Sequence, residues 1–526
     1  MKKWLVVCVL ASLALVLTLP ALAVDVDFSG EYRIRGFYND NPTLQDDGEK
    51  DSASWLDHRF RLQAVLNAND KVSITTRADV FDDQTFGDED LFFDGDGHAD
   101  NDDIDVDAVY MTIMSPIGLF KGGRIPGGSA WGTDLGNTGV DYSFDRLEYF
   151  AATKEKDLVF GALYEKLVED NTLGDVDDEG DCDSYYVLGV LKKDKVEAGM
   201  ALRYQDVDEV ADLVDNLPLI EVVDLYSAGT DISALAPMVG YPTGTYYMDL
   251  RQSVPATSPL GQTLGAANGL PPGTGVPVPA TPLASGISGI YYSYENLQNY
   301  ALAPYVKASF GVIGLEAEVI YEMGEYEAAN RGITFLDANL QPVAFDDRDI
   351  DALTFKVEAS ADLEKAAFNL GYASAQGQDY GELLKTDGDI TIGNLLYHGI
   401  GDDFRPLMIL TGDAGGQPLN NGYTTMFSGV NLLYAGASFP LNDKLTLRGA
   451  LGQAWTDEDD YSGGDDDLGF EVDLGLTWKI MDNLVYLADV GYLDEGDEIL
   501  AGTALLPAAG NGDATFAVSN EIKVTF

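Results

Sequence analysis

The final eleven residues, 516–526, alternate between apolar and polar side chains with a period of two. One parity, interrupted only at position 520, holds Phe516, Val518, Ile522, Val524 and Phe526. Successive side chains of a strand point to opposite faces of a sheet, so this pattern predicts a strand with one apolar face and one polar face. Its last residue is aromatic and ends the sequence. Such a strand is suited to closing a sheet by pairing with the first strand.

The same period recurs in three successive segments near the other end, over 26–38, 55–68 and 72–80. In 55–68, one face would carry Leu56, Phe60, Leu62, Ala64 and Leu66, and the other Asp57, Arg59, Arg61 and Gln63. A helix would repeat its apolar residues every three or four positions instead. The segments are therefore predicted to be strands of an all-β protein.

Tight turns and long polar segments alternate between the predicted strands. Eight tight turns are expected, at 69–70, 115–118, 154–157, 192–195, 311–314, 361–365, 440–444 and 481–483. Long segments separate these hairpins at 82–103, 168–183, 326–347, 376–424, 457–467 and 495–514. If each turn closes a hairpin and one more strand stands at each terminus, the strand count is eighteen, with sixteen to twenty also compatible.

This asymmetry is typical of outer-membrane barrels, which have short periplasmic turns and long extracellular loops. The terminal strand also resembles the C-terminal strand of bacterial outer-membrane barrels, which ends on Phe. We expect a transmembrane antiparallel β-barrel of about eighteen strands with long acidic extracellular loops, placed in the outer membrane of a Gram-negative bacterium. The mean hydropathy of -0.06 fits, because alternating faces cancel in the average.

The N-terminus predicts export. Lys2 and Lys3 precede an apolar run over 5–19, and Ala21-Leu22-Ala23 offers a cleavage site. We expect a signal peptide over 1–23 and one barrel domain over 24–526. Cys182 would then be the only cysteine of the mature chain and cannot form an internal disulfide.

One long segment breaks the pattern. Residues 206–288 are rich in Pro, Gly, Ala and Thr, and they carry almost no charge after Arg251. A structureless segment of this length usually has a function or is disordered. It either folds into the lumen as a constriction or plug, or forms a flexible external loop.

Basic residues are the strongest functional signal. Eight of the thirteen arginines fall in predicted strands on the parity opposite the apolar face, which points into the lumen of a barrel. These candidate pore-lining residues are Arg33, Arg35, Arg59, Arg61, Arg77, Arg124, Arg146 and Arg203. An arginine-lined wall favours anions. The alternative is that these arginines form cross-strand ion pairs with Glu31, Asp57, Asp79 and Glu148.

Two motifs resemble known porins. Gly123-Arg124-Ile125-Pro126, Trp131-Gly132-Thr133 and Asp145-Arg146 resemble the G-R-x-P, W-G-T and D-R stretch of some Gram-negative porins. The paired R-x-R strands and terminal Phe526 resemble the alginate-export type of eighteen-strand barrel. That second resemblance implies a lumen that passes an acidic polysaccharide along its arginines.

Acidic residues gather in the expected loops. Twelve Asp or Glu and no Lys or Arg lie between positions 82 and 107. Asp94, Asp96, Asp100 and Asp102 alternate with small or polar residues and form a candidate Ca²⁺ site, although the EF-hand order is missing. The alternative is a solvated, self-repelling surface, and an open acidic mouth would concentrate cations.

Signals of catalysis are absent from the sequence. The three histidines are His58, His98 and His398, and none belongs to a hydrolase, metalloprotease or phosphate-binding motif. The net charge of -57 excludes nucleic acid as a partner. We expect no enzyme activity and no cofactor.

The expected function is a porin that passes small hydrophilic solutes or ions by passive diffusion. Its other partners would be outer-membrane lipid and lipopolysaccharide, and its oligomeric state is left open. The alternatives are a dedicated channel for acidic saccharides and a plugged, non-conducting acidic surface barrel.

Overall fold

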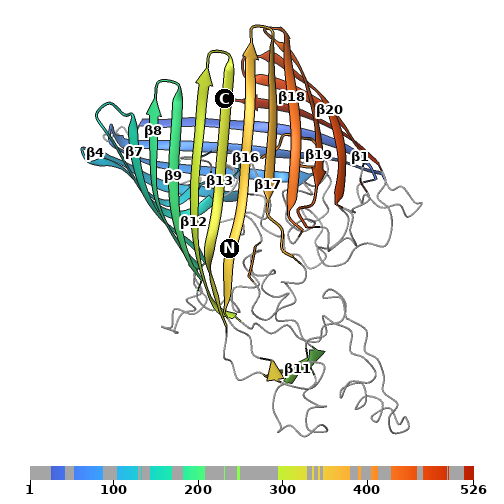
Figure 1. Ribbon diagram of the computed structural model, residues 1–526. Coiled ribbons are helices and arrows are strands. Elements are labelled where there is room, and N and C mark those ends of the chain that lie inside the picture. Colours follow the sequence, from blue (N-terminus) through green and yellow to red (C-terminus); the bar gives the residue numbers. More distant parts are fainter. Residues whose placement is uncertain are drawn as a thin grey trace, which may run out of the picture.

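Backbone pairing follows the chain from its first strand to its last and then returns to the first. The computed structural model describes residues 25–41, 52–86, 104–127, 132, 135, 143–168, 182–207, 230–231, 246–248, 294–328, 334–336, 342–343, 347–379, 389–391, 404–412, 428–458, 466–494, 496 and 514–526. Within them, eighteen antiparallel strands form one closed barrel (Figure 1). The predicted fold class and strand number are confirmed.

The barrel strands alternate in direction around the ring. They are β1 (Asp25–Asp40), β2 (Ser52–Asn69), β3 (Val72–Thr85), β4 (Ile104–Ser115), β5 (Gly118–Pro126), β6 (Ser143–Ala152), β7 (Leu158–Val168), β8 (Cys182–Lys193), β9 (Val196–Val207), β12 (Tyr294–Phe310), β13 (Ile313–Ala328), β16 (Arg348–Leu363), β17 (Ala366–Ala375), β18 (Val430–Asn442), β19 (Leu445–Trp455), β20 (Asp467–Met481), β21 (Leu484–Asp494) and β22 (Thr515–Thr525). A separate small sheet contains β10 (Thr230–Asp231), β11 (Tyr246–Met248), β14 (Thr334–Leu336) and β15 (Pro342–Val343).

The terminal strand closes the barrel. β22 pairs with β1 from Glu31 opposite Thr525 to Asp40 opposite Phe516. Gly30 and Phe526 extend this seam by exchanging backbone hydrogen bonds of 2.9 and 3.0 Å. A side chain at position 30 would clash with the Phe526 ring, whose atoms lie 2.7 Å from an ideal Cβ. The last residue is therefore part of the closure.

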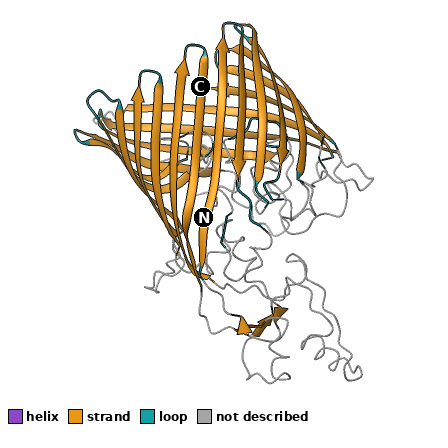
Figure 2. Ribbon diagram, viewed as in Figure 1, coloured by secondary structure: helices purple, strands orange, loops and turns teal. Residues whose placement is uncertain are grey.

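All eight predicted tight turns connect neighbouring strands and share one rim, drawn in teal at the top of Figure 2. In the β6–β7 turn, the Thr153 hydroxyl donates to the Asp157 carboxylate at 2.6 Å. This hydrogen bond lowers the pKa of Asp157. The connections on the other rim are longer, so the alternation of short and long connections is as the sequence indicates.

The two faces of the wall differ as the period of two predicts. Leu147, Val187 and Leu474 are 60%, 62% and 69% exposed on the outer face. Their neighbours Glu148 and Asp473 turn inward and are buried. In the part of the chain that the structure describes, no helix is long and apolar enough to cross a membrane.

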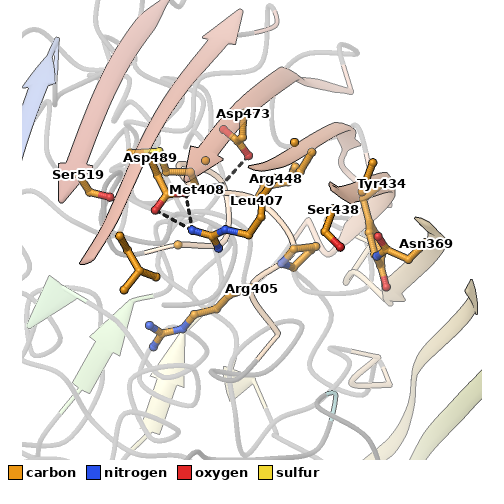
Figure 3. Close-up of a pocket in the computed structure, with 18 of the residues that line it drawn as sticks. Asn369, Arg405, Leu407, Met408, Tyr434, Ser438, Arg448, Asp473, Asp489 and Ser519 are labelled. Carbon is orange, nitrogen blue, oxygen red and sulfur yellow. Dashed lines mark hydrogen bonds and ion pairs between the residues drawn. The ribbon is translucent and has the colours of Figure 1, made fainter. Parts of the chain in front are cut away.

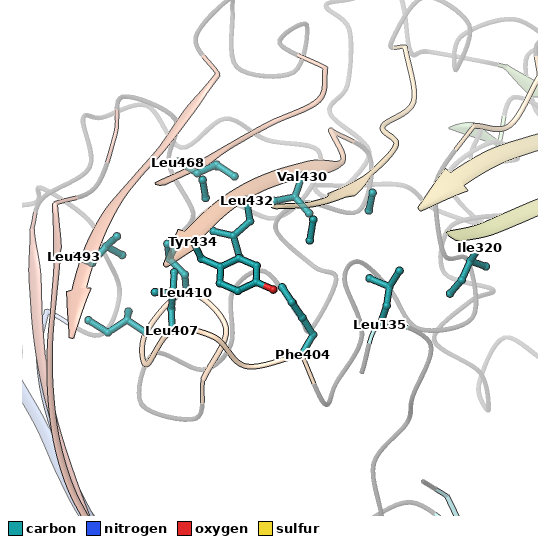
Figure 4. Close-up of a cluster of buried hydrophobic side chains, with 14 of the residues drawn as sticks. Leu135, Ile320, Phe404, Leu407, Leu410, Val430, Leu432, Tyr434, Leu468 and Leu493 are labelled. Carbon is teal, nitrogen blue, oxygen red and sulfur yellow. The ribbon is translucent and has the colours of Figure 1, made fainter. Parts of the chain in front are cut away.

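The main apolar core lies inside the barrel, on one side of it. Residues 404–412, from the connection between β17 and β18, place Phe404, Leu407 and Leu410 against the inner wall (Figure 4). The wall contributes Leu432 of β18 and Leu493 of β21, among others. A connection thus returns into the barrel and buries apolar side chains there.

Several predictions fall outside the described residues. These are the signal peptide at 1–23 and the candidate Ca²⁺ ligands Asp94, Asp96, Asp100 and Asp102. The segment 206–288 is described only at 206–207, 230–231 and 246–248.

An outward charge tests the assignment of the faces. Leu474→Arg, at the middle of β20, should destabilise the protein in a lipid bilayer by about 2–4 kcal/mol, because lipid does not solvate the guanidinium. Thr477→Arg on the same strand points inward and is the matched control, with a smaller expected loss. Urea unfolding in liposomes measures both. Equal losses at the two positions would contradict the assignment.

Candidate functional site: the charged inner wall

Arginines gather on the inner face where β1, β2 and β3 run side by side. Arg33 of β1 stands directly opposite Arg59 of β2, and Glu31 stands opposite Arg61. We call Arg33, Arg35, Arg59, Arg61 and Arg77 the arginine wall. Like charges directly opposite each other destabilise a sheet. The wall therefore needs carboxylates between its guanidinium groups.

Carboxylates of the same strands supply that compensation. Arg59 donates to Glu31 at 3.0 Å, and Arg35 makes two 2.9 Å hydrogen bonds to Asp57. Arg61 binds Asp79, its cross-strand neighbour, at 2.8 Å. All three carboxylates were predicted from the sequence as cross-strand partners of the arginines under the alternative interpretation. The wall is an alternating array of charges.

Two further carboxylates join the wall without having been predicted. Asp107 of β4 pairs with Arg77 and lies 3.8 Å from Arg61. Asp83 bridges Arg33 and Arg35, at 3.0 Å from the latter. In the sequence analysis, Asp83 and Asp107 were only two of the twelve acidic residues between positions 82 and 107.

A bulge in β3 places Asp83. The register shifts between Phe60, which faces Val80, and His58, which faces Gln84. Phe81 and Asp83 adopt positive φ angles of 54° and 52° within this bulge. Bulges re-aim side chains and recur near functional sites. A strict alternation read from sequence cannot show such a change of direction.

Ion pairs continue around the inner face. Arg146 of β6 pairs with Glu165 of β7, and Arg203 of β9 binds the fully buried Glu322 of β13 at 2.7 Å. Glu148 was predicted as a possible partner of an arginine, but it forms an ion pair with Lys121 at 3.4 Å. Seven of the eight candidate arginines thus lie on the inner face in ion pairs.

Arg124 is the exception, and its predicted inward position is wrong. It stands opposite Val109 and Asp145, on the same outer face as Leu147. Its side chain is exposed, and it has no ion pair among the described residues. Gly123, with a φ of 127°, precedes it and faces Arg146 on the inner side. The parity of β5 was misassigned because its glycines leave few side chains to reveal the pattern.

The wall opposite the arginines carries carboxylates. β13 lies nine strands from β2 around the ring, and it turns Glu316, Glu318 and Glu322 inward. Glu316 binds Lys356 at 3.1 Å. Gly132, from the connection between β5 and β6, approaches Glu318, whose carboxylate oxygen lies 3.0 Å from an ideal Cβ. Its φ of 89° is one that favours glycine.

A cavity of about 690 Å³ lies beside residues 404–412 and is bordered by one end of the arginine wall, at Arg33 and Arg35. Its lining includes Arg33, Arg35 and Arg405, together with the pair formed by Arg448 and Asp489 at 2.8 Å (Figure 3). The cavity therefore presents both charge signs to a hydrophilic solute. Neither Arg405 nor Arg448 was among the pore-lining residues predicted from the sequence. Arg405 lies outside every predicted strand.

No enzyme-like cluster is visible in the described ranges. His58 lies on the outer face, stacked 4.8 Å from Phe81 and in edge contact with Phe86 at 4.6 Å. Within these ranges, no group of three His, Cys, Asp or Glu residues could hold a metal ion. The expected lack of enzyme activity and of a cofactor stays a prediction.

No protein family model matches the chain, and neither does any curated protein. Similar solved structures include Pseudomonas aeruginosa OpdQ, at 9% identity over 96% of this chain and 99% of that one, with a TM-score of 0.46. Pseudomonas aeruginosa OccK8 (OprE) is 10% identical over 95% and 98%, with a TM-score of 0.45. The anion-selective porin from Comamonas acidovorans is 10% identical over 95% and 99%, with a TM-score of 0.37. At these values the similarity says nothing about function, and the resemblance to alginate-export barrels stays a prediction.

Breaking one ion pair tests the arginine wall. Arg61→Ala should destabilise the barrel by about 3–5 kcal/mol, because it leaves the buried Asp79 carboxylate without its partner. The double variant Arg61→Ala/Asp79→Ala should lose less. Arg124→Ala is the control and should change stability by less than about 0.5 kcal/mol. Denaturant unfolding gives all three values, and a double variant that loses more stability than Arg61→Ala alone would refute the coupling.

Proposed function

We propose that the protein is an outer-membrane porin that passes small hydrophilic solutes or ions by passive diffusion. The observation that carries this proposal is the closed barrel with an apolar outer face and a charged inner face that borders a cavity of about 690 Å³. A sheet with this distribution suits lipid outside and water inside. The proposed location is the outer membrane of a Gram-negative bacterium, with outer-membrane lipid and lipopolysaccharide around the barrel.

The ion pairs argue against a strongly anion-selective lumen on electrostatic grounds. Each guanidinium of the arginine wall has a carboxylate partner, so the wall carries little net charge. Opposite charges a few ångströms apart produce a local field that decays quickly in water. We infer that this wall orients dipolar solutes as they pass.

The alternative functions receive less support. An acidic saccharide would have to compete with carboxylates that already engage the arginines. The plug of the second alternative would be residues 206–288, most of which lie outside the described residues, and the described residues border a cavity large enough for a small solute.

Single-channel recording tests the porin proposal. The mature chain, residues 24–526, is expected to give discrete conductance steps in a planar bilayer. Block of these steps by an acidic oligosaccharide would favour the saccharide channel instead. A correctly folded barrel without any conductance would support the plugged alternative and overturn the proposal.

Selectivity should respond to single charges at the bridge between Arg33 and Arg35. Asp83→Asn is expected to shift the reversal potential in a salt gradient toward anions, and Arg33→Gln toward cations. One charge about 7 Å from the ion path is worth about 0.6 kcal/mol in water, so local ion concentrations should change about two- to threefold. Shifts of the same sign for both variants would contradict this role of the wall.

A further inference from the structure

Residues 404–412 occupy the inside of the barrel without being part of its sheet. Phe404, Leu407, Ile409 and Leu410 are at most 3% exposed, and they pack on the inner faces of β18, β20 and β21. The backbone of this segment bends and forms no strand. Its amide groups therefore need partners other than a neighbouring strand, since buried N–H groups are costly when unpaired.

One carboxylate provides these partners. The amides of Met408 and Ile409 donate to Glu471 Oε1 at 2.9 and 2.6 Å, and that of Leu410 donates to Glu471 Oε2 at 2.8 Å. Met408 also reaches Asp473 Oδ2 at 3.1 Å. Successive amides that converge on one anion form a nest, a recurrent anion-binding arrangement. Here the anion belongs to the barrel wall and the nest to the inserted segment.

The segment is preorganised for this contact. The Thr411 hydroxyl accepts from the Leu407 amide and donates to the Leu407 carbonyl, both at 3.0 Å. This closes a short turn around the three donating amides. Thr411 is itself fully buried.

Glu471 shares its site with Asp473 on the inner face of β20, and the two carboxyl side chains interact directly. The cross-strand neighbours of Glu471 are Gly452 of β19 and Leu493 of β21, and neither carries a charge. Arg448, the basic residue on the nearby inner face, is bound to Asp489. The amides of residues 408–410 are thus the backbone donors that Glu471 receives at this buried site.

We propose that Glu471 is the anchor that seats residues 404–412 against the wall and thereby sets the width of the channel. This inference rests on the proposed porin function. The seated segment lines the cavity with Arg405, Leu407 and Met408 (Figure 3). Release of the segment would remove this lining and widen the lumen on that side.

Thiol labelling measures the seating independently of conduction. Ile409→Cys, in a Cys182→Ser background, places a thiol at a position that is 0% exposed when the segment is seated. Adding Glu471→Ala should raise the labelling rate by about 100-fold, because three hydrogen bonds of about 1 kcal/mol each are lost. Glu471→Gln keeps one acceptor oxygen and should give an intermediate rate. Glu471→Gln also tests the anchor if Glu471→Ala does not fold.

Conductance measures the consequence for the channel. Glu471→Ala should give larger single-channel steps than the parent protein. Glu521→Ala is the charge-matched control, because this carboxylate also borders the cavity but is paired with Lys523 rather than with residues 404–412. Glu521→Ala should leave the labelling rate at position 409 unchanged, so a change in its step size reports the lost charge at the cavity and not release of the segment.

The outcomes separate the two proposals. An unchanged labelling rate in Glu471→Ala would overturn the anchor, whether or not the protein conducts. Faster labelling with an unchanged step size would overturn the claim that the segment sets the channel width. Absence of conductance in the parent protein would refute the porin function. The labelling rates with and without Glu471→Ala would still test the anchor in that case.

Discussion

The closure of β22 on β1 is the constraint on which the other features depend. In a sheet that faces lipid, an unpaired strand edge would leave a row of backbone groups without hydrogen bonds, and only a closed barrel avoids this. The seam between Gly30 and Phe526 completes the ring with two backbone hydrogen bonds. Closure then fixes which parity faces inward on every strand. It also creates the enclosed space in which charged side chains and returning connections can meet.

Inside that space, electrostatics dictates how arginines can be placed close together. Arg33 and Arg59 stand opposite each other across two strands, which is unfavourable unless carboxylates intervene. Glu31 and Asp83 provide them. The same rule applies at the buried pair of Arg203 and Glu322. The arginine wall therefore carries many charges but little net charge.

The inserted segment 404–412 follows a different principle, in which backbone amides take the place of basic side chains. A buried carboxylate needs either a cation or several hydrogen-bond donors. Glu471 receives three amides, and the apolar side chains of the same segment cover it from water. Polar and apolar contacts thus support each other at this point. The result narrows the barrel without a strand or a helix crossing it.

The sequence by itself determined the barrel, its strand number and most of its inward arginines, because side-chain alternation and turn residues are local properties of the chain. Strands 26–38 and 55–68 were recognisable for that reason. Only the tertiary structure decided the partners of the arginines, the outward position of Arg124 and the role of Asp83, which depend on register and on a bulge. The contact between Glu471 and residues 408–410 was equally hidden from the sequence. It joins groups more than sixty positions apart through backbone amides, which every residue except proline possesses and which no sequence pattern can mark.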